Sequence, residues 1–128
     1  MEPKQDELLY QIGITLIPGI GSITAKKLIS YCGGTEAVFK EKKAALLKIP
    51  GVGESLAKVI MEQDVLGQAE DEVKFVLKNK IEPLFFLNKN YPNRLKHCMD
   101  SPVLLYWKGN ADLNQQQIIS VVGTRKAT

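Results

Sequence analysis

The sequence predicts an α+β chain, with a small all-helical domain over residues 1–80 and the first strands of an α/β domain over residues 81–128. Two observations predict the helical part: apolar residues recur at helical spacing, and one segment repeats at an offset of 32 residues. After residue 80 the pattern changes to short apolar runs bounded by Pro, Gly and Asn, which is typical of strands. No apolar run reaches the roughly 18 residues that a membrane span needs.

The repeat places the same residue types at the same spacing twice. Residues 17–28 read Ile-Pro-Gly-Ile-Gly-Ser-Ile-Thr-Ala-Lys-Lys-Leu, and residues 49–60 read Ile-Pro-Gly-Val-Gly-Glu-Ser-Leu-Ala-Lys-Val-Ile. Pro ends the preceding helix because it donates no backbone hydrogen bond and restricts the residue before it. The two glycines allow a tight turn and a close backbone approach. A second helix then begins, and its first N–H groups can bind a phosphate because they have no intrahelical acceptor.

This pattern resembles the helix-hairpin-helix motif, and the pair resembles the tandem, SAM-like form that contacts DNA phosphates without reading bases. The candidate DNA-binding residues are the paired glycines and the lysines one turn into each second helix: Gly19, Gly21, Lys26, Lys27, Gly51, Gly53 and Lys58. The apolar positions of the repeat are more simply explained as the shared core of two packed hairpins. A structural or protein-docking module therefore remains an alternative.

An enzymatic role is not supported by the residues. Some base-excision glycosylases carry this hairpin with a Lys two residues after the second glycine, but that position is Ile23 in the first copy and Ser55 in the second. The single histidine, His97, has no carboxylate pair and no zinc-ligand spacing around it. Cys32 and Cys98 have no Cys-x-x-Cys spacing and are expected to be reduced thiols. We expect a non-enzymatic protein with no cofactor and no metal.

Net charge limits how the repeat could bind a polyanion. Residues 1–64 carry eight Lys and eight Asp or Glu, whereas residues 65–128 carry nine Lys or Arg and six Asp or Glu, which accounts for the whole net charge of +3. The hairpins would therefore need local backbone donors rather than bulk charge. The N-terminus is polar and acidic, without a secretory signal, so a cytoplasmic protein is expected.

Three strands are expected after residue 80, over residues 84–87, 103–107 and 117–122, with a short helix after Tyr91-Pro92. The third run leads directly into Gly123-Thr124-Arg125 and Lys126. A strand followed by such a turn is typical of the start of a parallel α/β domain, and the arginine can fork onto two phosphate oxygens. A single glycine does not make a dinucleotide fingerprint. Candidate base-stacking aromatics are Tyr91, Tyr106 and Trp107, although most of them are expected in the core.

The order of these pieces resembles the DNA processing protein A (DprA/Smf) family. The resemblance is carried by four patterns: the glycine-rich repeat, Asn90-Tyr91-Pro92 with Leu95, Ser101-Pro102-Val103-Leu104-Leu105-Tyr106 with Lys108-Gly109, and Val121-Val122-Gly123-Thr124-Arg125-Lys126-Ala127-Thr128. It implies a helical domain before a Rossmann-like domain, with Gly123, Thr124 and Arg125 in a DNA-phosphate pocket. It also implies single-stranded DNA as ligand, RecA recombinase as partner, a homodimer at full length, and a role in natural transformation and DNA recombination.

The family's Rossmann-like domain continues well beyond its Gly-Ser/Thr-Arg segment, so we expect this chain to be an N-terminal fragment with a truncated Rossmann-like domain. One alternative is a Rossmann-type enzyme that handles nucleotides or phosphate and carries a helical appendage. The other is that the helical half serves only as a protein-docking module. Binding of a small nucleotide without oligonucleotide binding would favour the enzyme.

Overall fold

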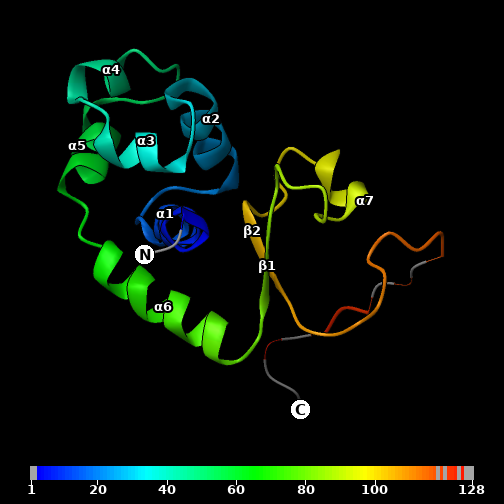
Figure 1. Cartoon of the computed structure of the whole chain (residues 1–128). Coiled ribbons are helices and arrows are strands. Elements are labelled where there is room, and N and C mark those ends of the chain that lie inside the picture. Colours follow the sequence, from blue (N-terminus) through cyan, green and yellow to red (C-terminus); the bar gives the residue numbers. More distant parts are fainter. Residues whose placement is uncertain (1–2, 118, 120, 124, 126–128) are drawn as a thin grey trace.

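The computed structural model describes residues 3–117, 119, 121–123 and 125. Six helices come first, then a strand, a short helix and a second strand (Figure 1). The bounds are α1 Pro3–Leu16, α2 Ser22–Cys32, α3 Thr35–Lys40, α4 Lys43–Leu47, α5 Glu54–Glu62, α6 Leu66–Lys78, β1 Glu82–Phe85, α7 Asn93–Lys96 and β2 Leu104–Trp107. The expected α+β architecture, helical first and stranded afterwards, is confirmed.

Helix α1 lies at the centre of the helical part, with α2, α3, α6 and the strands around it (Figure 1). Its apolar residues do not keep to one stripe, and this predicts a helix that is buried on most sides. Leu8, Leu9, Ile12 and Ile14 are all buried, and Ile14 has no exposed surface. The core of the molecule is therefore organised around α1.

Gly13 allows two other helices to approach α1 closely. A methyl group at this position would lie 3.0 Å from Cζ of Phe39 in α3 and 3.2 Å from Cδ2 of Leu66 in α6. Gly13 is itself buried, and the Phe39 ring also packs against Tyr10, with 5.5 Å between the ring centroids. Any side chain larger than hydrogen at Gly13 would therefore clash with both α3 and α6.

Strands β1 and β2 form an antiparallel pair in which Glu82 lies opposite Trp107 and Phe85 opposite Leu104. The first strand begins before Pro83, whereas the sequence predicted a start after it. A proline is tolerated here because each strand of a two-stranded sheet is an edge strand. Phe85 and Leu104 belong to the same hydrophobic core as the helices, so the sheet packs on the helical part.

The segment between the strands is fixed by Tyr91. Its ring is fully buried, and its hydroxyl donates a hydrogen bond of 2.7 Å to the carbonyl oxygen of Pro102. Helix α7 follows at Asn93, where a short helix was expected. Of the aromatic side chains considered for base stacking, Tyr91 is core, Trp107 is half-buried and Tyr106 is exposed.

The third expected strand is not formed by the described residues of 117–122. Ile119, Val121 and Val122 are each at least 90% exposed, and none lies in a helix or strand. A strand of a parallel sheet needs a paired neighbour and covering helices, and nothing among the described residues supplies either. The strand pair that the described residues do form is antiparallel, so the parallel sheet expected here is not present in that part of the chain. In the same part of the chain, no helix has both the length and the apolar character needed to cross a membrane.

Replacing Gly13 with Ala should lower the free energy of unfolding by about 1 kcal/mol, because overpacking outweighs the gain in helix propensity. Gly67 in α6 is the matched control, since nothing lies within 4 Å of the position that a methyl group would take there. Gly67→Ala should raise stability by roughly 0.5–1 kcal/mol. Urea unfolding followed by circular dichroism measures both; equal effects of the two substitutions would contradict the close approach at Gly13.

Candidate nucleic-acid interface

The two copies of the sequence repeat fold into the same turn. In the first, the Ile20 N–H donates to the Ile17 carbonyl over 3.4 Å and Gly19 has φ +78°. In the second, the Val52 N–H donates to the Ile49 carbonyl over 3.0 Å, and Gly51 has φ +89°. Proline in the first central position and glycine at positive φ in the second define a type II turn. The first turn joins α1 to α2 and the second joins α4 to α5.

The glycine after each turn begins the next helix. Gly21 and Gly53 are the N-cap residues of α2 and α5, both with extended backbone and neither with a side-chain capping hydrogen bond. The first intrahelical bonds come from Ala25 to Gly21 and from Ala57 to Gly53, each over 2.9 Å. The N–H groups of the first three residues of each helix therefore have no intrahelical acceptor. These donors and the positive end of the helix dipole favour an anion such as phosphate.

The glycines leave room for such an anion. No atom lies within 4 Å of the methyl position at Gly19, Gly21 or Gly53. At Gly51 the one close atom is Nζ of Lys27, 3.3 Å from that position. A lysine from the first copy therefore lies over the second turn. Lys27 is thus placed to add a positive charge to the second anion site.

The two helix ends differ in charge. The first turn of α2 has no acidic residue and begins with Ser22, whereas α5 begins with Glu54. The Glu54 carboxylate pairs with the Lys43 ammonium across 2.9 Å, and both side chains are largely exposed. A carboxylate at a helix N-terminus competes with a bound phosphate for the same donors. By its own residues, the end of α2 therefore suits an anion better than the end of α5. At the end of α5, Lys43 offsets the charge of Glu54, and Lys27 adds a positive charge.

Lys26 and Lys58 occupy equivalent positions in the repeat but have different surroundings. Nζ of Lys26 donates to Oγ of Ser101 over 2.8 Å and to the Met99 carbonyl over 3.2 Å, and it lies 5.4 Å from the centroid of the Phe86 ring. Lys58 is exposed on α5. The predicted lysine of the first copy therefore ties α2 to the segment between the strands, and the lysine of the second copy faces solvent.

Gly123 and Arg125 lie outside helices and strands and are exposed. Thr124 and Lys126 fall outside the described residues. The structure brings Lys27 of the first copy to Gly51 of the second turn, and it places Gly123 and Arg125 in a separate segment. The phosphate pocket expected around Gly123, Thr124 and Arg125 stays a prediction.

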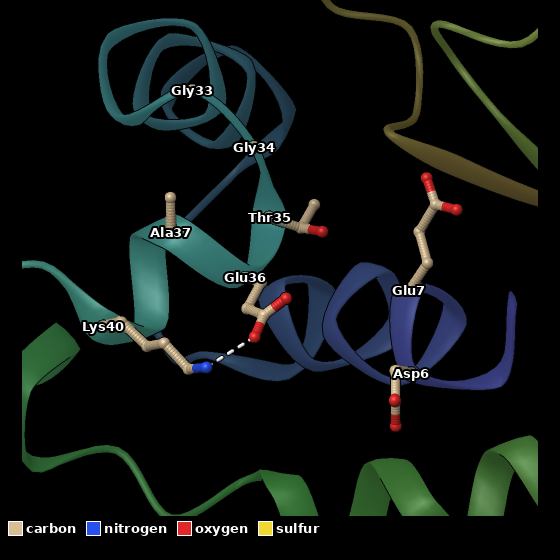
Figure 2. Close-up of a pocket in the computed structure, with 8 residues that line it drawn as sticks. All are labelled: Asp6, Glu7, Gly33, Gly34, Thr35, Glu36, Ala37 and Lys40. Carbon is tan, nitrogen blue, oxygen red and sulfur yellow. Dashed lines mark hydrogen bonds and ion pairs between the residues drawn. The ribbon is translucent and has the colours of Figure 1, made fainter. Parts of the chain in front are cut away.

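A broad cleft of about 670 Å³ lies at the other ends of α1 and α2 from the first turn. Figure 2 shows Asp6 and Glu7 of α1 and Glu36 of α3 around it, with Lys40 paired to Glu36. The carboxylate of Glu36 raises the pKa of Lys40, which holds that ammonium in its charged form. Three carboxylates against one paired ammonium repel a polyanion, so this cleft is not the nucleic-acid interface.

No reactive side chain stands out near the turns. Burial, followed by the nearby Glu41 carboxylate, raises the pKa of the Cys32 thiol, and this keeps the thiol protonated near neutral pH. Among the described residues no three His, Cys, Asp or Glu side chains gather in a way that could hold a metal ion.

The C-terminal part of the chain matches a known family. Residues 82–128 match the family model described as DNA recombination-mediator protein A. The match supports membership of that family over this part of the chain only. The resemblance drawn from the sequence is confirmed for these residues. The matched region includes the strand pair, α7 and residues 123–128.

The chain is also similar to proteins named UvrABC system protein C from Wolbachia. Identity is 36% to the protein of strain wRi, 32% to that of Wolbachia pipientis wMel and 30% to that of strain wPip. Each match spans 59 residues, 46% of this chain and only 10% of the relative. A match of that length is longer than residues 82–128, so part of it lies in the helical half. No solved structure matches the chain.

Gly19→Ala and Gly51→Ala should each lower the free energy of unfolding by about 1–2 kcal/mol, because a Cβ is disfavoured at their positive φ. Similar decreases at both positions in thermal or urea unfolding would support the shared turn geometry. A neutral substitution at either position would show that this turn is not type II.

Lys26→Met should destabilise the chain by about 1–2 kcal/mol, because methionine cannot donate the hydrogen bonds to Met99 and Ser101. Lys58→Met removes the equivalent lysine of the second copy and should change stability by no more than about 0.5 kcal/mol. The two variants are compared by urea unfolding at equal salt. If both variants lower the free energy of unfolding equally, the contact of Lys26 with the Met99–Ser101 segment does not contribute to stability.

Proposed function

We propose that this chain is a non-enzymatic, single-stranded-DNA-binding part of a recombination mediator, and that it holds DNA phosphates at the N-termini of α2 and α5. The observation that carries the proposal is the duplicated turn with a glycine N-cap that leaves the first helical N–H groups without a side-chain cap. The family match of residues 82–128 supports a partner in DNA recombination.

The finer features of the proposal follow the family resemblance. We take the two turns with their helices as tandem helix-hairpin-helix units and residues 81–128 as the start of a Rossmann-like domain. The protein would protect incoming single strands in the cytoplasm during natural transformation, help to load RecA and act as a homodimer. The Gly123-Thr124-Arg125 segment would supply a further phosphate contact.

Backbone donors explain how a neutral region could bind DNA. Residues 1–64 carry no net charge, yet each helix end presents several N–H groups and the positive end of a dipole. Phosphates are the same in every nucleotide, so contacts of this kind give affinity without sequence preference. Binding should weaken with salt in proportion to the number of phosphates bound.

Serine at the two N-cap positions provides a sharp test. Gly21→Ser and Gly53→Ser suit the extended backbone there, and each new hydroxyl can accept a hydrogen bond from a free N–H of its own helix. Stability should rise by a few tenths of a kcal/mol while DNA affinity falls severalfold, because the hydroxyl occupies the donors that phosphate would use. Fluorescence anisotropy with a labelled oligothymidine measures the affinity, and urea unfolding measures the stability.

Gly67→Ser is the control, since Gly67 is exposed in α6 and away from both turns. Unchanged oligonucleotide affinity in the double serine variant would leave the turns as structural or protein-docking elements. Arg125→Ala in the same assay tests the family's phosphate segment. A chain that binds a mononucleotide but no oligonucleotide would favour the nucleotide-handling enzyme instead.

A further inference from the structure

A second cleft lies between α2 and α7. Its volume is about 390 Å³, and it is lined by Lys26, Phe86, Leu87, Lys96 and Ser101. In Figure 1, α7 lies at the end of the strand pair where β1 finishes and β2 begins. The cleft therefore joins a lysine of the helical half to a lysine of the family-matched half.

The charge of Lys26 has no carboxylate partner within hydrogen-bonding reach among the described residues. Its half-buried ammonium donates to a hydroxyl and a backbone carbonyl, and it faces the Phe86 ring. The ion pairs formed in that part of the chain involve Lys40 and Lys43 instead. Charges withdrawn from water are usually compensated by an opposite charge, and neutral acceptors compensate Lys26 only in part. An anion in the cleft would complete that compensation.

The chain around the cleft adds to the positive charge. Between Phe86 and Ser101 the sequence carries Lys89, Arg94 and Lys96 against a single carboxylate, Asp100. The Arg94 guanidinium donates to the Gln116 carbonyl over 2.8 Å and so also has a neutral partner. A cleft lined by one sign of charge concentrates ions of the opposite sign.

We propose that this cleft binds a phosphate of a nucleic-acid backbone between Lys26 and Lys96. Phe86 and the exposed Leu87 supply an apolar wall against which a sugar or a base can pack. Lys26 is four residues into α2, so the cleft lies within about 6 Å, along the helix axis, of the anion site at the N-terminus of α2. The inference rests on the proposed DNA binding and adds an interaction that uses side-chain charge rather than backbone donors.

Lys26→Gln, Lys96→Gln and the double variant test the cleft in the 128-residue chain. Glutamine retains an amide donor for Ser101 and removes the charge. The slope of log affinity against log salt for an oligothymidine should become shallower by about 0.7 for each phosphate that the variant no longer neutralises. Lys74→Gln, on the exposed face of α6, is the matched control and should leave the slope unchanged.

The outcomes separate the two proposals. If the unaltered chain binds no oligonucleotide, the proposed function fails and this inference fails with it. If the chain binds and the double variant keeps the original slope, only the cleft is rejected. Lys96 is exposed, so Lys96→Gln is expected to fold. If the Lys26 variant does not fold, the salt slope of Lys96→Gln alone tests whether the cleft binds a phosphate. A double variant that no longer binds inorganic phosphate but keeps the oligonucleotide slope would show that the cleft takes free phosphate, which would overturn the backbone assignment.

Discussion

The burial of α1 is the constraint on which the rest of the structure depends. Its apolar residues point in several directions, so they can be covered only if helices and strands gather around it. Gly13 sets how closely α3 and α6 approach, because hydrogen is the largest group that fits between Phe39 and Leu66. The first turn follows directly from the end of this buried helix, so the position of α2 is determined by α1.

The two copies of the repeat share a backbone and differ in their surroundings. Both turns are type II, and both helices begin at a glycine without a side-chain cap. The first copy packs against the stranded part, where Lys26 contacts Met99 and Ser101. The second copy is more exposed and is joined by Lys27 from the first. The two copies thus share the backbone geometry of the turn and the uncapped helix start, while their side chains have different surroundings.

Charge is arranged along the helices rather than spread over the chain. The N-terminus of α2 lacks acidic residues, while its C-terminal end opens onto the cleft of Asp6, Glu7 and Glu36. The helix dipole runs in the same sense, with its positive end at the turn. The positive end of the α2 dipole and the three carboxylates therefore lie at opposite ends of α2, although residues 1–64 have no net charge.

The sequence by itself determined the helical first part, both turns and the α7 segment, because Pro, Gly and apolar spacing act locally on the backbone. It also carried the family resemblance of residues 82–128. It missed the start of β1 before Pro83, and it predicted a strand over residues 117–122 that the described residues there do not form, because strand formation depends on partners distant in the chain. The sequence also did not predict the cleft between Lys26 and Lys96, because these two lysines are distant in sequence. Local chemistry sets turns and helices, whereas tertiary packing alone decides which charges meet.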